Sequence, residues 1–392
     1  MRKATVCLAV VTLFSFVFFL PPAMVQSKEI LIGISTPLSG AAAPAGLGVL
    51  RSIELGADEI NSQGGLKVGK EACPIKLISY DSKYDVREAL AIANKLIYYD
   101  KVKYVFTFGG TCIVATNPLI NENKILHLAY GYGGKKATNP DGPYTFRAII
   151  EPIQMHTVLL PWIAKKYSLK TIALTSTDDE TGLAQAEDAE YVAKKLGLTI
   201  TDKAFAPRGT ADFTPMLTRL VAKKPEAIDF GSWSGSDGPL ICKQTRELGY
   251  KGLLIFSYTQ SIPTFQKVAG DFMDGVLFYG VFATDPTPMA TKMAQQYEEK
   301  YKQRFDPYVW RNHVALFVLK RAIEIAGTLD PTPVKNAMPK ARIESVCGPT
   351  TVGGKSYYGY DCQVLFPVPV TTYDAKQKKL VELYRGAMPA DY

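Results

Sequence analysis

The chain has 392 residues and a formal net charge of +8; 47% of its residues are hydrophobic and 21% are charged. This is the composition of an ordinary globular protein, and the length suits two domains better than one. The basic excess is spread along the chain in short pairs such as Lys165-Lys166 and Lys194-Lys195, which lie late in helix-like segments. Solvated helix ends explain such pairs better than a nucleic-acid surface does, so we expect no nucleic-acid partner.

The N-terminal segment has the order of a secretory leader. Arg2 and Lys3 precede an uncharged apolar run over 4–20, which is followed by two prolines and a short stretch that ends at Ser27. We therefore predict that residues 1–27 are a cleaved signal peptide and that the mature, exported protein begins at Lys28. The alternative is an N-terminal membrane anchor, because the apolar run is close to spanning length. The prolines and the absence of flanking charge beyond them favour cleavage.

Strand-like and helix-like segments then alternate twice along the chain. Apolar runs bounded by turn residues predict strands, and apolar residues at helical spacing predict helices. This alternation indicates an α/β fold with parallel sheets. In the first stretch we expect strands over 30–34, 75–80 and 104–108 and helices over 48–60 and 86–99. In the second, over 148–275, we expect helices over 153–167, 181–196, 213–223 and 239–248, and strands over 171–175, 198–205, 227–230 and 253–257. A strand over 275–281 and helices over 288–301 and 309–326 are expected to complete one of the two lobes, and the tail over 363–384 is strand-like.

An ordered set of short segments resembles the branched-chain amino-acid-type (Leu/Ile/Val-binding-like) periplasmic solute-binding proteins. The segments are Ile30-Leu31-Ile32-Gly33, Pro37-Leu38-Ser39-Gly40, Gly56-Ala57-Asp58-Glu59-Ile60-Asn61, Tyr80-Asp81-Ser82, Asn121-Glu122-Asn123-Lys124-Ile125, Tyr144-Thr145-Phe146-Arg147, Asp212-Phe213-Thr214-Pro215-Met216-Leu217 and Gly348-Pro349. The resemblance implies a type I periplasmic binding fold, with two Rossmann-like lobes and three crossovers near 147–150, 275–282 and 345–365. It implies an N-terminal lobe of 28–147 plus 282–347 and a C-terminal lobe of 148–281 plus 362–392.

The same resemblance implies a function. It predicts an extracytoplasmic substrate-binding protein of an ABC importer, a monomer that captures a small organic solute by hinge closure and delivers it to a membrane permease with a cytoplasmic ATPase. It implies no cofactor and no metal. A ligand-sensing module of the same fold is the alternative. Enzymatic readings are weak: Gly46-x-Gly48 is followed by Arg51 where a dinucleotide fingerprint needs glycine, and Trp233 occupies the place of a nucleophile-elbow serine.

The family pattern places the ligand against loops that follow the strands of both lobes. Backbone N–H groups at helix N-termini and hydroxyl groups are the donors expected there. For each position the alternative is an ordinary connecting loop. The candidate ligand-binding residues are Ser39, Gly110, Thr111, Cys112, Gly131, Tyr132, Thr181, Trp233 and Tyr258.

The chain also departs from this pattern. Amino-acid-binding relatives commonly hold the ligand ammonium with an acidic residue in the last of these loops, but no carboxylate lies between Phe256 and Phe265. Thr181 stands where relatives carry an aromatic residue, while tyrosines and Trp233 add aromatic surface. We therefore expect a ligand that need not be an amino acid, such as an aromatic or short carboxylate or an amide. Asp178, Asp179 and Glu180 remain the alternative partners for an ammonium group.

Five cysteines remain after the predicted cleavage, and none forms a Cys-x-x-Cys pair. With three scattered histidines, this pattern predicts no zinc site. Cys347 and Cys362 flank a Gly- and Tyr-rich stretch that is typical of a hairpin. Because export permits disulfides, we predict that these two cysteines are bridged and that Cys112 remains a thiol near the crevice.

Overall fold

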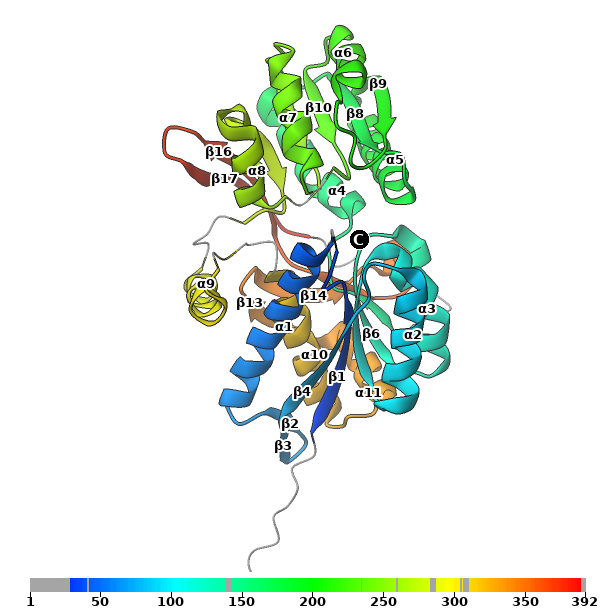
Figure 1. Ribbon diagram of the computed structural model, residues 1–392. Coiled ribbons are helices and arrows are strands. Elements are labelled where there is room, and N and C mark those ends of the chain that lie inside the picture. The colour runs from blue at the N-terminus through cyan, green and yellow to red at the C-terminus, as the bar shows by residue number, and fades with distance from the viewer. Residues whose placement is uncertain are drawn as a thin grey trace, which may run out of the picture.

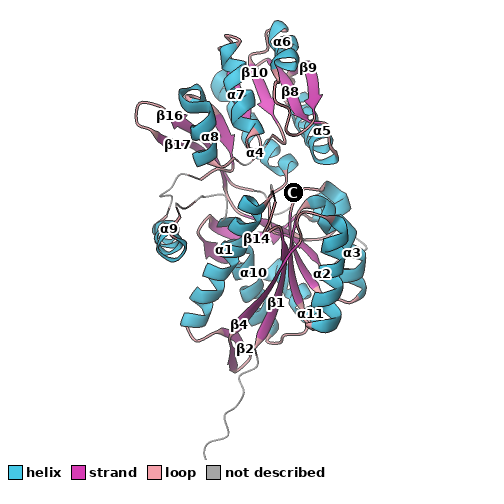
Figure 2. Cartoon of the chain, viewed as in Figure 1, coloured by secondary structure: helices cyan, strands magenta, loops and turns pink. Residues whose placement is uncertain are grey.

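The computed structural model describes residues 29–40, 42–138, 143–233, 235–258, 260–282, 287–303, 305 and 310–388. The predicted signal peptide, residues 1–27, and the predicted mature N-terminus at Lys28 lie outside the described residues. Within the described ranges, no helix has the length and apolar character needed to cross a membrane. Two α/β units are stacked end to end, with helices on both faces of each sheet (Figures 1 and 2).

The first lobe is built on an eight-stranded sheet in the order β13-β14-β15-β7-β6-β5-β1-β4. The strands from β4 to β15 along this order are parallel, whereas β14 and β13 are antiparallel to their neighbours. Their bounds are β1 Ile30–Thr36, β4 Ile75–Asp81, β5 Tyr104–Phe108, β6 Leu126–Tyr130, β7 Thr145–Arg147, β13 Ile343–Ser345, β14 Gly348–Gly353 and β15 Gln363–Leu365. A separate hairpin pairs β2 (Leu66–Val68) with β3 (Glu71–Cys73).

The helices around this sheet follow the predicted periodicity. In α1, the expected apolar positions Val49, Ile53, Ala57 and Ile60 are all buried. This helix begins at Ala43, not at residue 48, so the loop after β1 is shorter than expected. The helices are α1 Ala43–Ser62, α2 Val86–Asn94 with a π-helical turn Lys95–Tyr99, α3 Gly110–Glu122, α9 Pro288–Tyr301, α10 Trp310–Ala326, α11 Pro331–Ala337 and α12 Lys355–Tyr358.

The second lobe is built on a seven-stranded sheet in the order β17-β16-β12-β11-β10-β8-β9. The strands from β12 to β9 are parallel, and a C-terminal antiparallel hairpin extends the sheet beyond β12. The strands are β8 Thr171–Thr177, β9 Thr199–Ala206, β10 Ala227–Phe230, β11 Leu253–Phe256, β12 Leu277–Tyr279, β16 Val368–Asp374 and β17 Lys379–Gly386. The helices are α4 Pro152–Tyr167, α5 Glu180–Lys195, α6 Thr214–Ala222, α7 Asp237–Glu247 and α8 Ile262–Ala269.

The chain passes between the two sheets three times. The first connection joins β7 to α4 over 148–151, and the second leaves β12 toward α9. The third is short, since β15 ends at Leu365 in the first sheet and β16 begins at Val368 in the second. The expected return to the second lobe at residue 362 is therefore too early, because β14 and β15 extend the first sheet.

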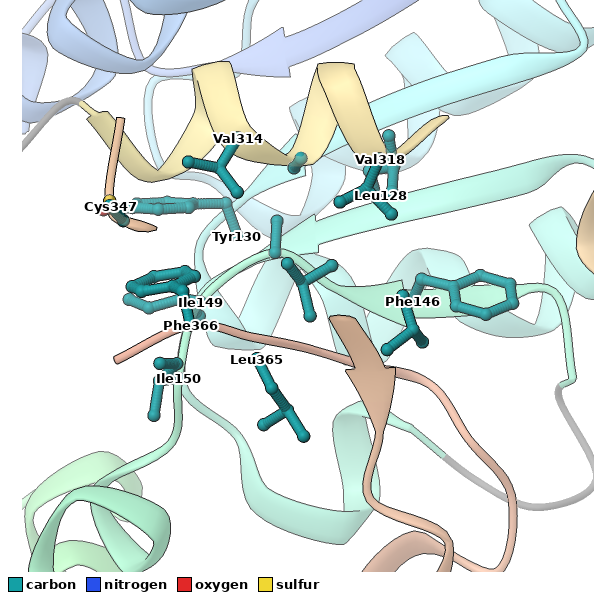
Figure 3. Packing of buried hydrophobic residues seen from close by; sticks show 14 of the residues in the cluster. Leu128, Tyr130, Phe146, Ile149, Ile150, Val314, Val318, Cys347, Leu365 and Phe366 are labelled. Carbon is teal, nitrogen blue, oxygen red and sulfur yellow. The ribbon is translucent and has the colours of Figure 1, made fainter. Parts of the chain in front are cut away.

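Apolar side chains pack where the first and third connections lie together. Ile149 and Ile150 of the first connection and Leu365 and Phe366 around the third belong to one buried cluster with Tyr130 (Figure 3). The side-chain amide of Gln363 donates to the Ile149 carbonyl at 2.8 Å, which ties the two connections to each other. These segments thus form one packed strap between the lobes.

The predicted disulfide between Cys347 and Cys362 is wrong. Strands β14 and β15 are antiparallel, with Gly353 opposite Gln363 and Thr351 opposite Leu365. This register puts Cys362 beside the closed end of the pair and Cys347 beyond its open end, about 20 Å away at ~3.3 Å per strand residue. A disulfide needs Cα atoms within about 7 Å, so these two cysteines cannot bridge in this fold. Cys112 is a buried free thiol, as expected.

Candidate ligand-binding site

Each sheet has one strand at which the order of neighbours reverses. β1 lies between β4 and β5, and β8 lies between β9 and β10. In open α/β sheets, ligands bind at the carboxyl ends of strands at such switch points. Here the two carboxyl edges face each other (Figure 1). The Tyr132 and Tyr258 rings meet across the lobes with centroids 4.9 Å apart, and Lys136 pairs with Glu180 at 2.6 Å.

In the first lobe, the loops after β5 and β6 are pressed against each other. A Cβ atom on Gly110 would lie 1.8 Å from the Tyr132 carbonyl oxygen, and one on Gly131 would lie 2.6 Å from the Gly110 nitrogen. Only glycine permits this approach. It places the N-terminus of α3 beside Tyr132. Among the described residues, no side chain caps this end of α3, so the first backbone N–H groups can serve a bound anion.

Five aromatic side chains gather between the lobes. Tyr84 lies edge-on to Phe108 at 5.9 Å, Phe108 stacks on Tyr130 at 5.7 Å, and Tyr132 meets Tyr258 of the second lobe. Burial raises the pKa of Tyr258 well above its ordinary value, and Tyr132 and Tyr84 lie near enough to reinforce the shift. The Tyr258 hydroxyl is therefore neutral at physiological pH and acts as a hydrogen-bonding group on a flat apolar face.

In the second lobe, Arg208 supplies positive charge at the same place. Its Nε donates to Asp179 at 2.5 Å, while Nη1 and Nη2 donate to the Ser232 carbonyl and the Thr177 hydroxyl at 2.9 and 3.2 Å. Asp179 is also the N-cap of α5 and accepts from the Gly182 N–H. Burial raises the pKa of Tyr84 and Tyr258, and the positive charge of Arg208 is near enough to oppose both shifts.

The acidic side chains of these loops have other partners. Asp81 accepts from the Leu38 and Lys83 N–H groups and the Ser39 hydroxyl, which lowers the pKa of its carboxyl to about 2. Asp179 is held by Arg208, and Glu180 pairs with Lys136. Asp178 is exposed. The carboxylates that could have held a ligand ammonium are thus committed elsewhere or lie in solvent.

The candidate residues separate into three groups. The first group lies where the carboxyl edges of the two sheets meet and consists of Gly110, Cys112, Gly131, Tyr132 and Tyr258. Thr111 is exposed in the first turn of α3, beside this group. Burial raises the pKa of the Cys112 thiol, so this group stays protonated.

Ser39 and Thr181 occupy less direct positions. The Ser39 hydroxyl is engaged by Asp81 at 2.6 Å and thereby fixes the loop after β1. Thr181 lies in the first turn of α5, one residue before the glycine that Asp179 caps. Both belong to the rim of the interlobe region.

Trp233 does not form a wall of the crevice. Its side chain is fully buried, and its ring packs edge-on against Phe213 at 5.0 Å in the second-lobe core. Its carbonyl accepts from Gln260 at 2.6 Å. The expectation of a stacking surface at Trp233 is wrong, because the local backbone turns this ring into the lobe.

The sequence reasoning missed Arg208, Tyr84 and Phe108. Arg208 follows β9 in a Pro-Arg-Gly turn, and Tyr84 lies in the loop after β4 with a left-handed φ of 60°. Both occupy the carboxyl ends of strands next to the switch strands. Applying the same topological rule to every predicted strand would have included them.

A polar cluster lies beneath the second-lobe loops. His156 of α4, Asp229 of β10 and Tyr279 of β12 are fully buried, with His156 Nδ1 3.6 Å from Asp229 Oδ2. The Ser257 hydroxyl donates to Asp229 at 2.5 Å. Burial raises the pKa of Asp229 to about 7 and lowers that of His156 to about 3. Asp229 is therefore protonated and His156 neutral at mildly acid pH.

Among the residues that the structure describes, no three His, Cys, Asp or Glu side chains are grouped so that they could hold a metal ion.

Comparison with known proteins identifies the class. Residues 29–374 match the family described as periplasmic binding protein, and this chain belongs to that family. It is 25% identical over 326 residues to the amino acid binding protein of Pseudomonas aeruginosa, covering 82% of this chain and 85% of that one. It is 26% identical over 328 residues to Leu/Ile/Val-binding protein homolog 8 of Brucella abortus, covering 79% of this chain and 80% of that one.

Solved structures share the fold. A leucine binding protein from Thermotoga maritima superposes with a TM-score of 0.75 at 19% identity, covering 91% of this chain and 99% of that one. A solute binding protein from Rhodopseudomonas palustris BisB5 in complex with 3,4-dihydroxy benzoic acid has a TM-score of 0.77 at 20% identity, covering 92% of this chain and 98% of that one. Another solute binding protein, from R. palustris in complex with benzoate, has a TM-score of 0.75 at 19% identity, covering 93% of this chain and 98% of that one. The type I two-lobed fold expected from the sequence is confirmed.

Proposed function

We propose that this chain is the substrate-binding component of an ABC importer. Its family membership supports the proposal, and so do the structural neighbours that are named as ABC transporter solute-binding proteins. In this account residues 1–27 are removed on export, and the mature protein works as a monomer in the periplasm. It passes its ligand to a membrane permease driven by a cytoplasmic ATPase, and it catalyses no reaction itself.

We infer that the ligand is a small aromatic carboxylate. The observation that carries this inference is the aromatic group between the lobes, which combines Tyr84, Phe108 and Tyr130 with the Tyr132–Tyr258 contact. Flat apolar faces bind a ring, and the tyrosine hydroxyls can bond its substituents. The ligand carboxylate would accept from the N-terminus of α3, with Gly110, Thr111 and Cys112 providing backbone N–H groups.

The electrostatics support a ligand without an ammonium group. A buried ammonium requires a carboxylate, because an unpaired buried charge carries a large desolvation cost. Asp179 and Glu180 are paired with Arg208 and Lys136, and the positive Arg208 lies next to the site. Two benzoate-type ligands in structures of the same fold are consistent with this class.

A ligand panel tests the proposal. Thermal unfolding of the mature protein should show stabilisation by benzoate and 4-hydroxybenzoate but not by leucine or valine. At a concentration of 100 times Kd, binding adds about 2.7 kcal/mol to the free energy of unfolding. Small-angle scattering with the stabilising ligand should show a smaller radius of gyration, as hinge closure requires. Stabilisation by leucine alone would overturn the ligand class and leave the family intact.

A further inference from the structure

Arg147 occupies an unusual place at the edge of the first lobe. It is the last residue of β7, and its side chain is fully buried. Its guanidinium Nη2 contacts the Gly131 carbonyl, in the loop that carries Tyr132. A buried arginine is rare unless it is paired, so its partners define what it does.

The paired carboxylate belongs to the other lobe. Nη2 of Arg147 also contacts the carboxylate of Glu151, which is itself buried. Glu151 is the N-cap of α4 and forms a reciprocal capping box with Gln154. The two residues are four apart but share no helix: one ends a strand of the first sheet, and the other begins a helix of the second lobe. The ion pair therefore spans the first connection between the lobes.

The segment that leads into β15, just before the third connection, is bonded to the same strand. The Arg147 N–H donates to the Cys362 carbonyl at 2.6 Å, and the Tyr360 hydroxyl donates to the Thr145 carbonyl at 2.9 Å. Ile149 and Phe366 lie in one apolar cluster (Figure 3). Arg147 is thus attached to the segment that leads into β15 as well as to Glu151 and to the ligand-side loop.

Two of its donors are unused. Nε and Nη1 of Arg147 are buried with no hydrogen-bond partner among the described residues, and the buried Tyr132 hydroxyl likewise lacks one there. Tyr132 lies near enough to act on the pKa of Arg147. An unpaired buried donor is unfavourable. A small movement of the Tyr132 loop or of α4 could supply these donors with acceptors.

We propose that Arg147 is a positioning residue that couples the orientation of the second lobe, through Glu151, to the position of the Gly131–Tyr132 loop. The proposal rests on the relative lobe movement of the proposed function, and it assigns that movement a specific mechanical link. When α4 rotates, Glu151 displaces the guanidinium, and the guanidinium displaces the loop on which the ligand ring rests.

The test measures lobe orientation without any ligand. Spin labels are attached at Arg87→Cys and Glu187→Cys, two exposed positions on opposite lobes. Double electron–electron resonance then reports the distribution of distances between the lobes. It is measured for the otherwise unchanged chain, Arg147→Met, Glu151→Gln and the double variant Arg147→Met/Glu151→Gln. The matched control is Lys320→Met/Glu324→Gln, which removes another i,i+4 ion pair, within α10 of the first lobe.

Each single variant should lower the unfolding midpoint, because it leaves one buried charge unpaired. The double variant should recover the midpoint, since it removes both charges and retains an acceptor at the helix cap. Both Arg147→Met chains should nevertheless show a broadened, shifted distance distribution, whereas the control should not. If the double variant has the unmodified distribution, Arg147 has only a structural role and the proposal fails. Because no ligand is added, this outcome is independent of whether benzoate binds.

Discussion

Replacing Gly110 with alanine should lower the free energy of unfolding by about 3 kcal/mol, the upper end of the cost of overpacking a closely packed site. The new Cβ would lie 1.8 Å from the Tyr132 carbonyl oxygen, a backbone atom that cannot rotate away. The loops after β5 and β6 would have to separate. That movement would displace both the N-terminus of α3 and Tyr132, so ligand binding should be lost as well.

The matched control is the neighbouring exposed residue. Thr111→Ala shortens an exposed side chain in the same helical turn, so its stability should change by less than about 0.5 kcal/mol. Urea denaturation of both variants measures the difference. Equal midpoints for Gly110→Ala and Thr111→Ala would show that the two loops are not in close contact in solution.

Single substitutions in the buried His156–Asp229 pair should change the pH dependence of stability in opposite directions. In Asp229→Asn, His156 is the member of the pair that still titrates. Its pKa is lowered from 6.5 to about 3, so between these values the unfolded chain binds a proton that the folded protein does not. Stability then rises with pH, by about 1.4 kcal/mol per pH unit relative to the unmodified protein.

In His156→Gln only Asp229 still titrates. Its pKa is raised from 3.8 to about 7, so the folded protein keeps a proton that the unfolded chain releases. Stability then falls as pH rises, with a slope of about 1.4 kcal/mol per pH unit. In the unmodified protein the two effects cancel between about pH 4.5 and 6, the range over which both slopes apply.

Chemical denaturation at several pH values between these limits measures the slopes. The unmodified protein is the reference, because every other titrating group is common to the three chains. Parallel pH profiles for the two variants would contradict the assigned protonation states, in which Asp229 is protonated and His156 is neutral.

Much of the fold was predictable because it depends on local pattern. The apolar spacing in α1 and the alternating elements of the second lobe appear in the structure within a few residues of their expected bounds. The division of the C-terminal strands between the two sheets was not predictable, because β15 joins the first sheet and β16 joins the second within three residues of each other. That division depends on long-range pairing, which no local pattern contains.

The site was predictable in position and less so in composition. The family pattern, which places the ligand against the loops that follow the strands, included Gly110, Tyr132 and Tyr258 among the candidates. The prediction for Trp233 was wrong because the exposure of its ring depends on the direction in which the loop turns. The predicted Cys347–Cys362 bridge was wrong because it depends on strand register. In the sequence, Arg147 was notable only as the last residue of a segment that resembles the family. Its contacts with Gly131 and Glu151 became evident only in three dimensions.

The central claim is that an aromatic carboxylate binds between the lobes against Tyr258, and calorimetric titration of benzoate into three chains tests it most directly. The unmodified protein and Tyr258→Phe should bind benzoate with similar affinity, because the ring contact with Tyr132 is retained. Tyr258→Ala should weaken binding by roughly 1–3 kcal/mol, because the ring that packs against the ligand is lost. Tight binding of leucine by the unmodified protein, with no heat from benzoate, would contradict the claim. That result would return Asp178, Asp179 or Glu180 as the partner of a ligand ammonium.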